Sequence, residues 1–92
     1  MYVVKPTKRY RKSLRRLVRS GSFDAKTFEM VVDALASGKP LEIKHQNHPL
    51  HGEYTDCFEC HIKGDLLLLY RLDEKKKILS IIDIGSHSEL FD

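Results

Sequence analysis

Apolar residues recur at helical spacing through the first half of the chain. Residues 2–4 predict a short strand that ends at Pro6. A first helix is predicted to begin after Thr7, whose hydroxyl can cap its amino terminus, and to end at Gly21. The apolar positions of this helix are Tyr10, Leu14, Leu17 and Val18. They share one side of the helix, and basic residues fill the others.

A second amphipathic helix is predicted to begin after Asp24, a suitable N-cap, and to end before Gly38 and Pro40. Its buried stripe is predicted to consist of Phe28, Val31, Val32 and Leu35. We expect the two helices to pair through their apolar stripes, because neither can bury its own apolar face.

The second half of the chain has the patterns of β-strands. Residues 39–56 are rich in His, Pro and Gly and are predicted to be irregular. Residues 58–63 then alternate, and the pattern places Phe58, Cys60 and Ile62 on one face and Glu59, His61 and Lys63 on the other. Gly64 is expected to form a tight turn into the next strand.

Two further segments are apolar on both faces. Residues 66–72 predict a central strand, and residues 78–84 follow a polar turn at residues 73–77. Residues 85–92 are long enough for only a single helical turn.

The order β-α-α-β-β-β predicts one α+β domain over residues 1–92, with a twisted, mainly antiparallel sheet packed on a helical pair. Because two short helices cannot cover both faces of two apolar strands, we expect one apolar patch to remain exposed.

The charges are segregated along the chain. Residues 1–23 carry eight Lys or Arg residues and no acid, whereas the remainder has eight against thirteen acids. Clustered cations favour a polyanionic partner, because binding to nucleic acid releases counterions. A solvated helix face is the alternative, and an anionic membrane surface is disfavoured by the few large apolar residues. The residues expected to contact RNA are Arg9, Lys12, Arg16 and Arg19.

The compartment follows from what the sequence lacks. No segment has the layout of a signal peptide, and the longest apolar run, residues 66–70, is too short to span a bilayer. A cytoplasmic protein without a membrane partner is therefore predicted. Its cysteines should stay reduced, with Cys60 in the core and Cys57 partly exposed.

Five histidines are the main chemical feature of the sequence: His45, His48, His51, His61 and His87. Imidazole can both donate and accept a proton near neutral pH. Cutting RNA without a metal needs a base for the ribose 2′-hydroxyl, an acid for the departing 5′-oxygen and a cation for the phosphorane. Histidines and aspartates at strand ends could supply the first two, and Arg or Lys the third.

Histidine and cysteine side chains could instead bind a metal ion. The spacing of His45, His48 and His51 would align them on a helix, but the intervening proline and the following glycine argue against a helix there. Cys57 and Cys60 are predicted to face opposite sides of a strand. We therefore expect no metal site and no cofactor.

Four segments together resemble the YafQ-type toxins of the RelE superfamily. They are His48-Pro49-Leu50-His51-Gly52, then Cys60-His61-Ile62 leading to Asp65, then Leu68-Leu69-Tyr70-Arg71-Leu72, and finally Gly85-Ser86-His87-Ser88-Glu89-Leu90-Phe91. Their order and spacing match across residues 48–91, and the first half fits in pattern and charge.

This resemblance implies a ribosome-dependent messenger-RNA endonuclease, the toxin of a type II toxin–antitoxin system. It implies attack of the 2′-hydroxyl on the next phosphate without a metal. It also implies a cognate antitoxin of the ribbon-helix-helix DNA-binding type, whose carboxyl-terminal segment wraps the toxin. Ribosome and messenger RNA are the other implied partners.

The resemblance also implies roles for individual residues. His48, His61, Asp65 and His87 fall on acid–base and phosphate-handling positions, and Phe91 falls on an aromatic that places the base. We assign His87 as the general acid and Asp65 or His48 as the general base.

Two positions depart from the family pattern. Leu66 stands where an aromatic residue is frequent, and Asp83 stands where Arg is usual and would repel a phosphate. We expect Arg71 or a residue of the basic helix to supply the missing cation. Alternation along the strand predicts that Asp83 shares the face of Leu79 and Ile81, so it should pair with a cation such as Arg71 or lie at the open end of the sheet.

These departures keep a second function open, that of a cleavage-deficient module that binds the ribosome, or operator DNA together with the antitoxin. A free-standing RNA-binding domain would explain the charge but not the carboxyl-terminal motif.

Overall fold

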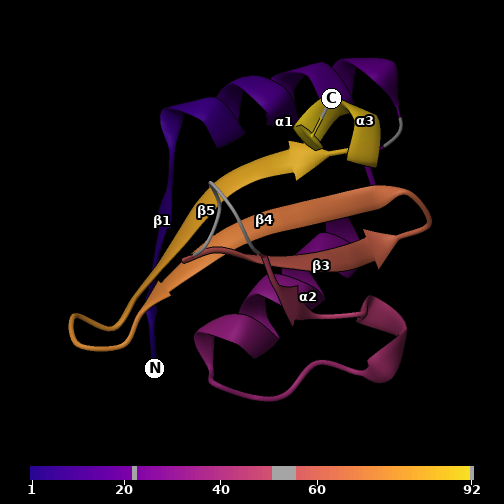
Figure 1. Ribbon diagram of the computed structural model, residues 1–92. Coiled ribbons are helices and arrows are strands. Elements are labelled where there is room, and N and C mark those ends of the chain that lie inside the picture. The colour runs from indigo at the N-terminus through magenta and orange to yellow at the C-terminus, as the bar shows by residue number, and fades with distance from the viewer. Residues whose placement is uncertain (22, 51–55, 92) are drawn as a thin grey trace.

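The computed structural model describes residues 1–21, 23–50 and 56–91. Its elements are β1 (Val3–Pro6), α1 (Lys8–Ser20), α2 (Ala25–Ala36), the 3-10 turn η1 (Ile43–His45), β2 (His48–Pro49), β3 (Phe58–Lys63), β4 (Leu66–Asp73), β5 (Ile78–Gly85) and α3 (His87–Phe91). This α+β arrangement confirms the predicted fold class (Figure 1). None of the helices in these described ranges is long and apolar enough to cross a membrane.

Both long helices begin at the residues that the sequence predicts. The side chain of Thr7 accepts a hydrogen bond from the Tyr10 amide (3.2 Å), and that of Asp24 accepts one from the Thr27 amide (3.1 Å). Gly21 ends α1 in a left-handed conformation with φ of 73°. These caps depend on side chains within a few residues of each helix end, so local sequence is enough to predict them.

The sheet is mixed, with the strand order β1-β5-β4-β3-β2. β1 is parallel to β5, and the other neighbours are antiparallel. β4 is therefore central, as predicted. β2 lies within residues 39–56, which we predicted to be irregular, and that prediction was wrong there. A strand of two residues is too short to show any periodicity and is held only by its pairing with β3.

The helices pack chiefly on the sheet, α1 along β5 and α2 against β3 (Figure 1). They meet each other at Tyr10 and Phe28, whose stacked rings lie 6.1 Å apart. The expected stripes enter or pack against one core, except that Val18 is 60% exposed and its place in the stripe was wrongly predicted. The buried core contains Tyr10, Leu17, Val31, Leu35, Cys60, Ile62, Leu68, Tyr70, Leu79, Ile81 and Ile84. The sheet, rather than the partner helix, therefore supplies most of the apolar surface that each helix covers.

A bulge interrupts β5. Leu69 pairs with Asp83 and the next residue of β4 pairs with Ile81, so Ile82 is an extra residue in β5. Directly paired residues share a face of the sheet. Asp83 therefore lies on the face opposite Ile81, and the expectation that it shares the face of Leu79 and Ile81 was wrong. Strict alternation holds only in an uninterrupted strand.

β4 also has apolar side chains on the sheet face opposite the core that contains Tyr10 and Val31, and this second face is covered. Leu67 and Leu69 are 1% and 0% exposed, and α3 packs on β5 with Leu90 buried. The predicted exposed apolar patch is therefore absent from this face among the described residues. The large apolar side chains that do reach solvent lie elsewhere and include Val3, Val18, Met30 and Ile43.

Candidate active site

The second face of the sheet carries a row of four paired residues. His48 pairs with Glu59, Glu59 with Leu69, and Leu69 with Asp83. Because paired residues project from the same face, this row crosses β2, β3, β4 and β5. Neighbouring strands lie about 4.8 Å apart, so the backbones at Glu59 and Asp83, two strands apart, are separated by about 10 Å. A second row beside it consists of His61, Leu67 and Gly85.

Glu59 joins two of the predicted site histidines. Its Oε1 lies 3.6 Å from Nε2 of His48 and 3.7 Å from Nε2 of His61. Glu59 is buried, whereas the side chain of His48 is 48% exposed and that of His61 26%. A carboxylate at this distance attracts a protonated imidazole, and a partly buried pair is screened less than one in water.

Sequence reasoning missed Glu59 as a site residue, because it assigned this side chain to an ordinary polar strand face. The available signal was its position two residues before His61, on the same side of the strand. The pairing that brings His48 onto this side chain depends on β2, which the sequence did not predict.

His45 holds the backbone of β3 at His61. It is buried, and its Nδ1–H donates to the backbone carbonyl of His61 at 2.6 Å. His45 and His48 are thus separated in role, one holding the β3 backbone and the other exposed. Among the described residues, no group of three or more His, Cys, Asp or Glu side chains is arranged to hold a metal ion. His51 and Gly52 lie outside the described residues.

A capping box fixes α3 at the end of β5. The Ser86 amide donates to Oε1 of Glu89 (2.8 Å), and the Glu89 amide donates to Oγ of Ser86 (3.2 Å). The backbone amide of His87 faces Oδ1 of Asp65 at 3.5 Å. The rings of His87 and Phe91 lie 5.0 Å apart, so the short helix presents an imidazole beside an aromatic ring.

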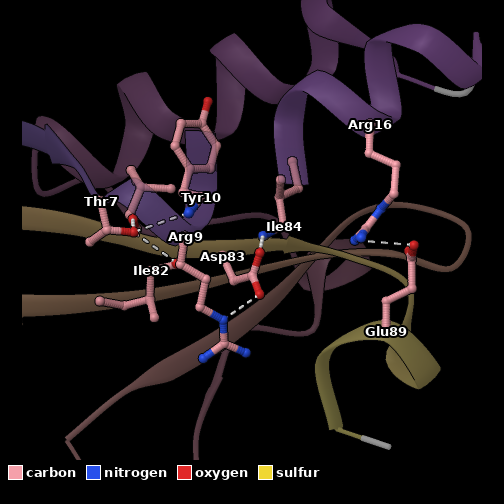
Figure 2. Close-up of polar contacts among 9 residues, drawn as sticks. Thr7, Arg9, Tyr10, Arg16, Ile82, Asp83, Ile84 and Glu89 are labelled. Atoms are coloured by element: carbon pink, nitrogen blue, oxygen red, sulfur yellow. Dashed lines mark hydrogen bonds and ion pairs between the residues drawn. The ribbon is translucent and has the colours of Figure 1, made fainter. Parts of the chain in front are cut away.

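The hydrogen bond from the Ser86 amide lowers the pKa of Glu89 below its ordinary value. Arg16, whose Nη2 lies 3.4 Å from Oε2 of Glu89, contributes in the same direction (Figure 2). A lowered pKa in the folded state means that the ionised carboxylate stabilises the fold. This contribution is present above the ordinary pKa and is lost as the pH falls through the lowered one.

We therefore expect α3 to loosen only in acid. The Ser86 amide resonance should shift as the pH falls below about 4.3, the ordinary Glu value. In the Glu89→Gln variant, which cannot ionise, this shift should be absent, and NMR titration of both proteins measures it. A Ser86 amide that titrates above the ordinary Glu value would contradict the assignment.

Asp83 is buried, and its partner is Arg9 rather than Arg71. The Nε–H of Arg9 donates to Oδ2 of Asp83 at 2.7 Å, and the Ile84 amide donates to Oδ1 at 2.8 Å (Figure 2). Arg71 instead directs Nη2 towards Sγ of Cys57, at 3.6 Å. Cys57 is only 2% exposed, so the prediction of a partly exposed thiol was wrong. Cys57 directly precedes β3.

The four cations predicted to contact RNA divide into two pairs. Arg9 and Arg16 form ion pairs with Asp83 and Glu89, and so connect α1 to β5 and α3 (Figure 2). Lys12 and Arg19 lie on the same stripe of α1 and are exposed. The four residues form a basic stripe along α1, and the ion pairs of Arg9 and Arg16 bring one side of this stripe to the candidate site.

The model of a protein family described as the bacterial toxin of type II toxin–antitoxin systems, YafQ, matches residues 2–92. This chain belongs to the YafQ toxin family. The resemblance that the motifs indicated is thereby confirmed. Three comparisons show how near the relatives are.

The mRNA interferase toxin YafQ of Escherichia coli is 33% identical over 52 residues, which are 56% of this chain and 54% of that protein. The chain thus spans about half the length of this curated YafQ relative. A metal-bound toxin from Helicobacter pylori is 43% identical, with a TM-score of 0.92, over 99% of this chain and 100% of that one. The E. coli DinJ–YafQ complex, at 20% identity and a TM-score of 0.87 over all of both chains, shares the YafQ fold.

Proposed function

We propose that this YafQ-family toxin is an mRNA interferase that cuts messenger RNA on the ribosome. The observation that carries the proposal is the row from His48 and Glu59 to Asp83 and Arg9. His48 and Glu59 lie at one end of this row and the ion pair of Asp83 with Arg9 lies at the other, an arrangement that supports acid–base cleavage beside a cation. The E. coli relative named an mRNA interferase supports the same activity.

The proposed reaction is attack of the ribose 2′-hydroxyl on the adjacent phosphate. His48 accepts the hydroxyl proton, the 2′-oxygen forms a bond to phosphorus, and the bond to the 5′-oxygen breaks. His87 donates a proton to that leaving oxygen. The products are a 2′,3′-cyclic phosphate and a free 5′-hydroxyl, and no metal is required to balance the step.

His48 suits the general base better than Asp65 does. The buried carboxylate of Glu59 lies 3.6 Å from His48 and would stabilise the imidazolium that forms when it takes the proton. Asp65 faces the backbone amide of His87, so its carboxylate is placed to hold the acid rather than to meet the 2′-hydroxyl. His61 shares Glu59 and would assist in handling the phosphate. Phe91 would stack on a base of the messenger.

Three partners follow from this proposal. The ribosome and messenger RNA would contact the basic stripe of α1 that consists of Arg9, Lys12, Arg16 and Arg19, with Arg71 as a further contact on the site face. The third is a cognate antitoxin of the ribbon-helix-helix type, whose acidic carboxyl-terminal segment would cover the basic stripe and the site. The E. coli DinJ–YafQ toxin–antitoxin complex supports an antitoxin partner. We place the toxin in the bacterial cytoplasm, where these partners are found.

Induced expression without a partner should arrest translation, and co-expression of the neighbouring reading frame should relieve the arrest. Mapping of 5′ ends on programmed ribosomes, with a chelator present, should reveal cuts that carry 5′-hydroxyl groups. Arrest with intact messenger would favour the cleavage-deficient binding module. Normal growth under strong induction would contradict both functions.

A further inference from the structure

The strand that carries His48 is too short to hold itself in place. β2 has two residues and lies at the edge of the sheet. Both pair with β3, and the amide of the following Leu50 donates to the Cys57 carbonyl at 2.9 Å. Because so few bonds form its ladder, β2 is shorter than strands that are stable by pairing alone. The position of His48 therefore depends on what fixes the chain just before it.

A hydroxyl group from the core reaches that part of the chain. Tyr70 of β4 is 1% exposed, and its ring stacks on Phe58 with the centroids 5.6 Å apart. Its hydroxyl donates to Oδ1 of Asn47 at 2.6 Å. Burial raises the pKa of Tyr70, so the hydroxyl remains a donor at neutral pH. A buried hydroxyl is costly without a partner, and the partner here is the residue directly before His48.

A second hydrogen bond holds the same turn from the other side. His45 binds the His61 carbonyl at 2.6 Å, and Asn47 binds Tyr70, so both neighbours of Gln46 are fixed. Gln46 itself is in the left-handed conformation, with φ of 44°, which is uncommon for residues other than glycine. Such a conformation persists only where the surrounding structure determines it, and it is frequent at functional sites.

This turn connects the two faces of the sheet. Asn47 meets Tyr70, which belongs to the core, whereas His48 meets Glu59 on the opposite face. The side chain of His48 is 48% exposed, so packing alone does not hold its ring. A bond made on the core face thus fixes the backbone that presents the imidazole to the site. Misplacement of a reacting group by about 1 Å can cost about 10²-fold in rate.

We infer that Tyr70 is a positioning residue of the site, which acts through Asn47 on His48. This inference rests on the proposed role of His48 as the general base. Tyr70 lies on the core face and touches neither His48 nor the surface that RNA would occupy. Its hydroxyl group therefore has a role that its ring, as part of the core, does not explain.

The first experiment compares Tyr70→Phe with Tyr10→Phe on programmed ribosomes. Both variants keep the aromatic ring and lose one hydroxyl from a core tyrosine, but Tyr10 packs on Phe28, away from β2. Tyr70→Phe should lower kcat by about 10-fold with KM little changed, because the base is present but less well placed. Tyr10→Phe should leave kcat unchanged. Equal rates for Tyr70→Phe and the wild type would overturn the inference.

A set of variants at Asn47 tests whether the effect passes through that residue. Asn47→Ala should lower kcat as Tyr70→Phe does, and the double variant should show no further loss, because both changes break the same bond. Asn47→Asp keeps an acceptor for the hydroxyl and should keep most of the rate. Losses that multiply in the double variant would show that the two residues act separately and would overturn the inference.

A measurement of hydrogen exchange does not depend on cleavage. In Tyr70→Phe the Leu50 amide, which reports the pairing of β2, should exchange about 10-fold faster, while amides between β4 and β5 keep their wild-type rates. Equal acceleration of all slowly exchanging amides would mean that the hydroxyl only stabilises the fold, and an unchanged Leu50 would mean that it does not hold β2. Either result would overturn the inference. Selective acceleration at Leu50 in a toxin that cuts no messenger would contradict only the proposed activity.

Discussion

Replacement of His87 with alanine is expected to lower the rate of messenger cleavage by about 10²–10⁴-fold, the usual contribution of a positioned acid. His87 is exposed at the first position of α3, and the capping box of Ser86 and Glu89 fixes that position. Ribosome binding should barely change, because the imidazole acts mainly in the transition state. Single-turnover cleavage and ribosome affinity, measured on the same variant, test both statements.

The role of His87 as the acid can be tested without relying on the size of the loss. A messenger with sulfur in place of the scissile 5′-oxygen has a leaving group that needs no proton. Such a substrate should restore most of the rate to His87→Ala. Ser88→Ala, a change at the adjacent exposed position of α3, is the control and should cleave both substrates as the wild type does. If sulfur gives no recovery, the proton comes from another group.

Replacement of Lys12 and Arg19 with glutamate should abolish association with the ribosome while leaving the fold intact. These two are the sharper choice, because Arg9 and Arg16 also form ion pairs that connect α1 to β5 and α3. In the wild type, the logarithm of affinity should fall with the logarithm of salt concentration, with a slope of about −0.9 per duplex phosphate neutralised. The variant should lose both the affinity and most of the slope.

The matched control for this reversal reverses Lys75 and Lys76 in the turn between β4 and β5. Both are exposed and the change in net charge is the same, but they lie away from α1. Sedimentation with ribosomes over a series of salt concentrations compares the two proteins. Equal loss in both would indicate a general charge effect, and survival of binding in the α1 variant would identify the stripe as a solvated surface.

The sequence by itself determined the features that depend on neighbours along the chain. The caps Thr7 and Asp24, the left-handed Gly21 and the turn at Gly64 were predicted correctly, because each is governed by side chains or backbone within a few residues. The central position of β4 followed from its apolar residues on both faces. The four motif segments were enough to identify the family.

Only the tertiary structure decided which side chains meet in the site. A one-residue change of register turns a strand residue to the other face, and the bulge at Ile82 does this to Asp83. A separate antiparallel pairing, of β2 with β3, sets Glu59 beside His48. The partner of Asp83 is Arg9, 74 residues earlier, and no local pattern records a contact of that separation. Strand register and helix docking are settled by packing of the whole chain, and they determine where the charges of this site lie.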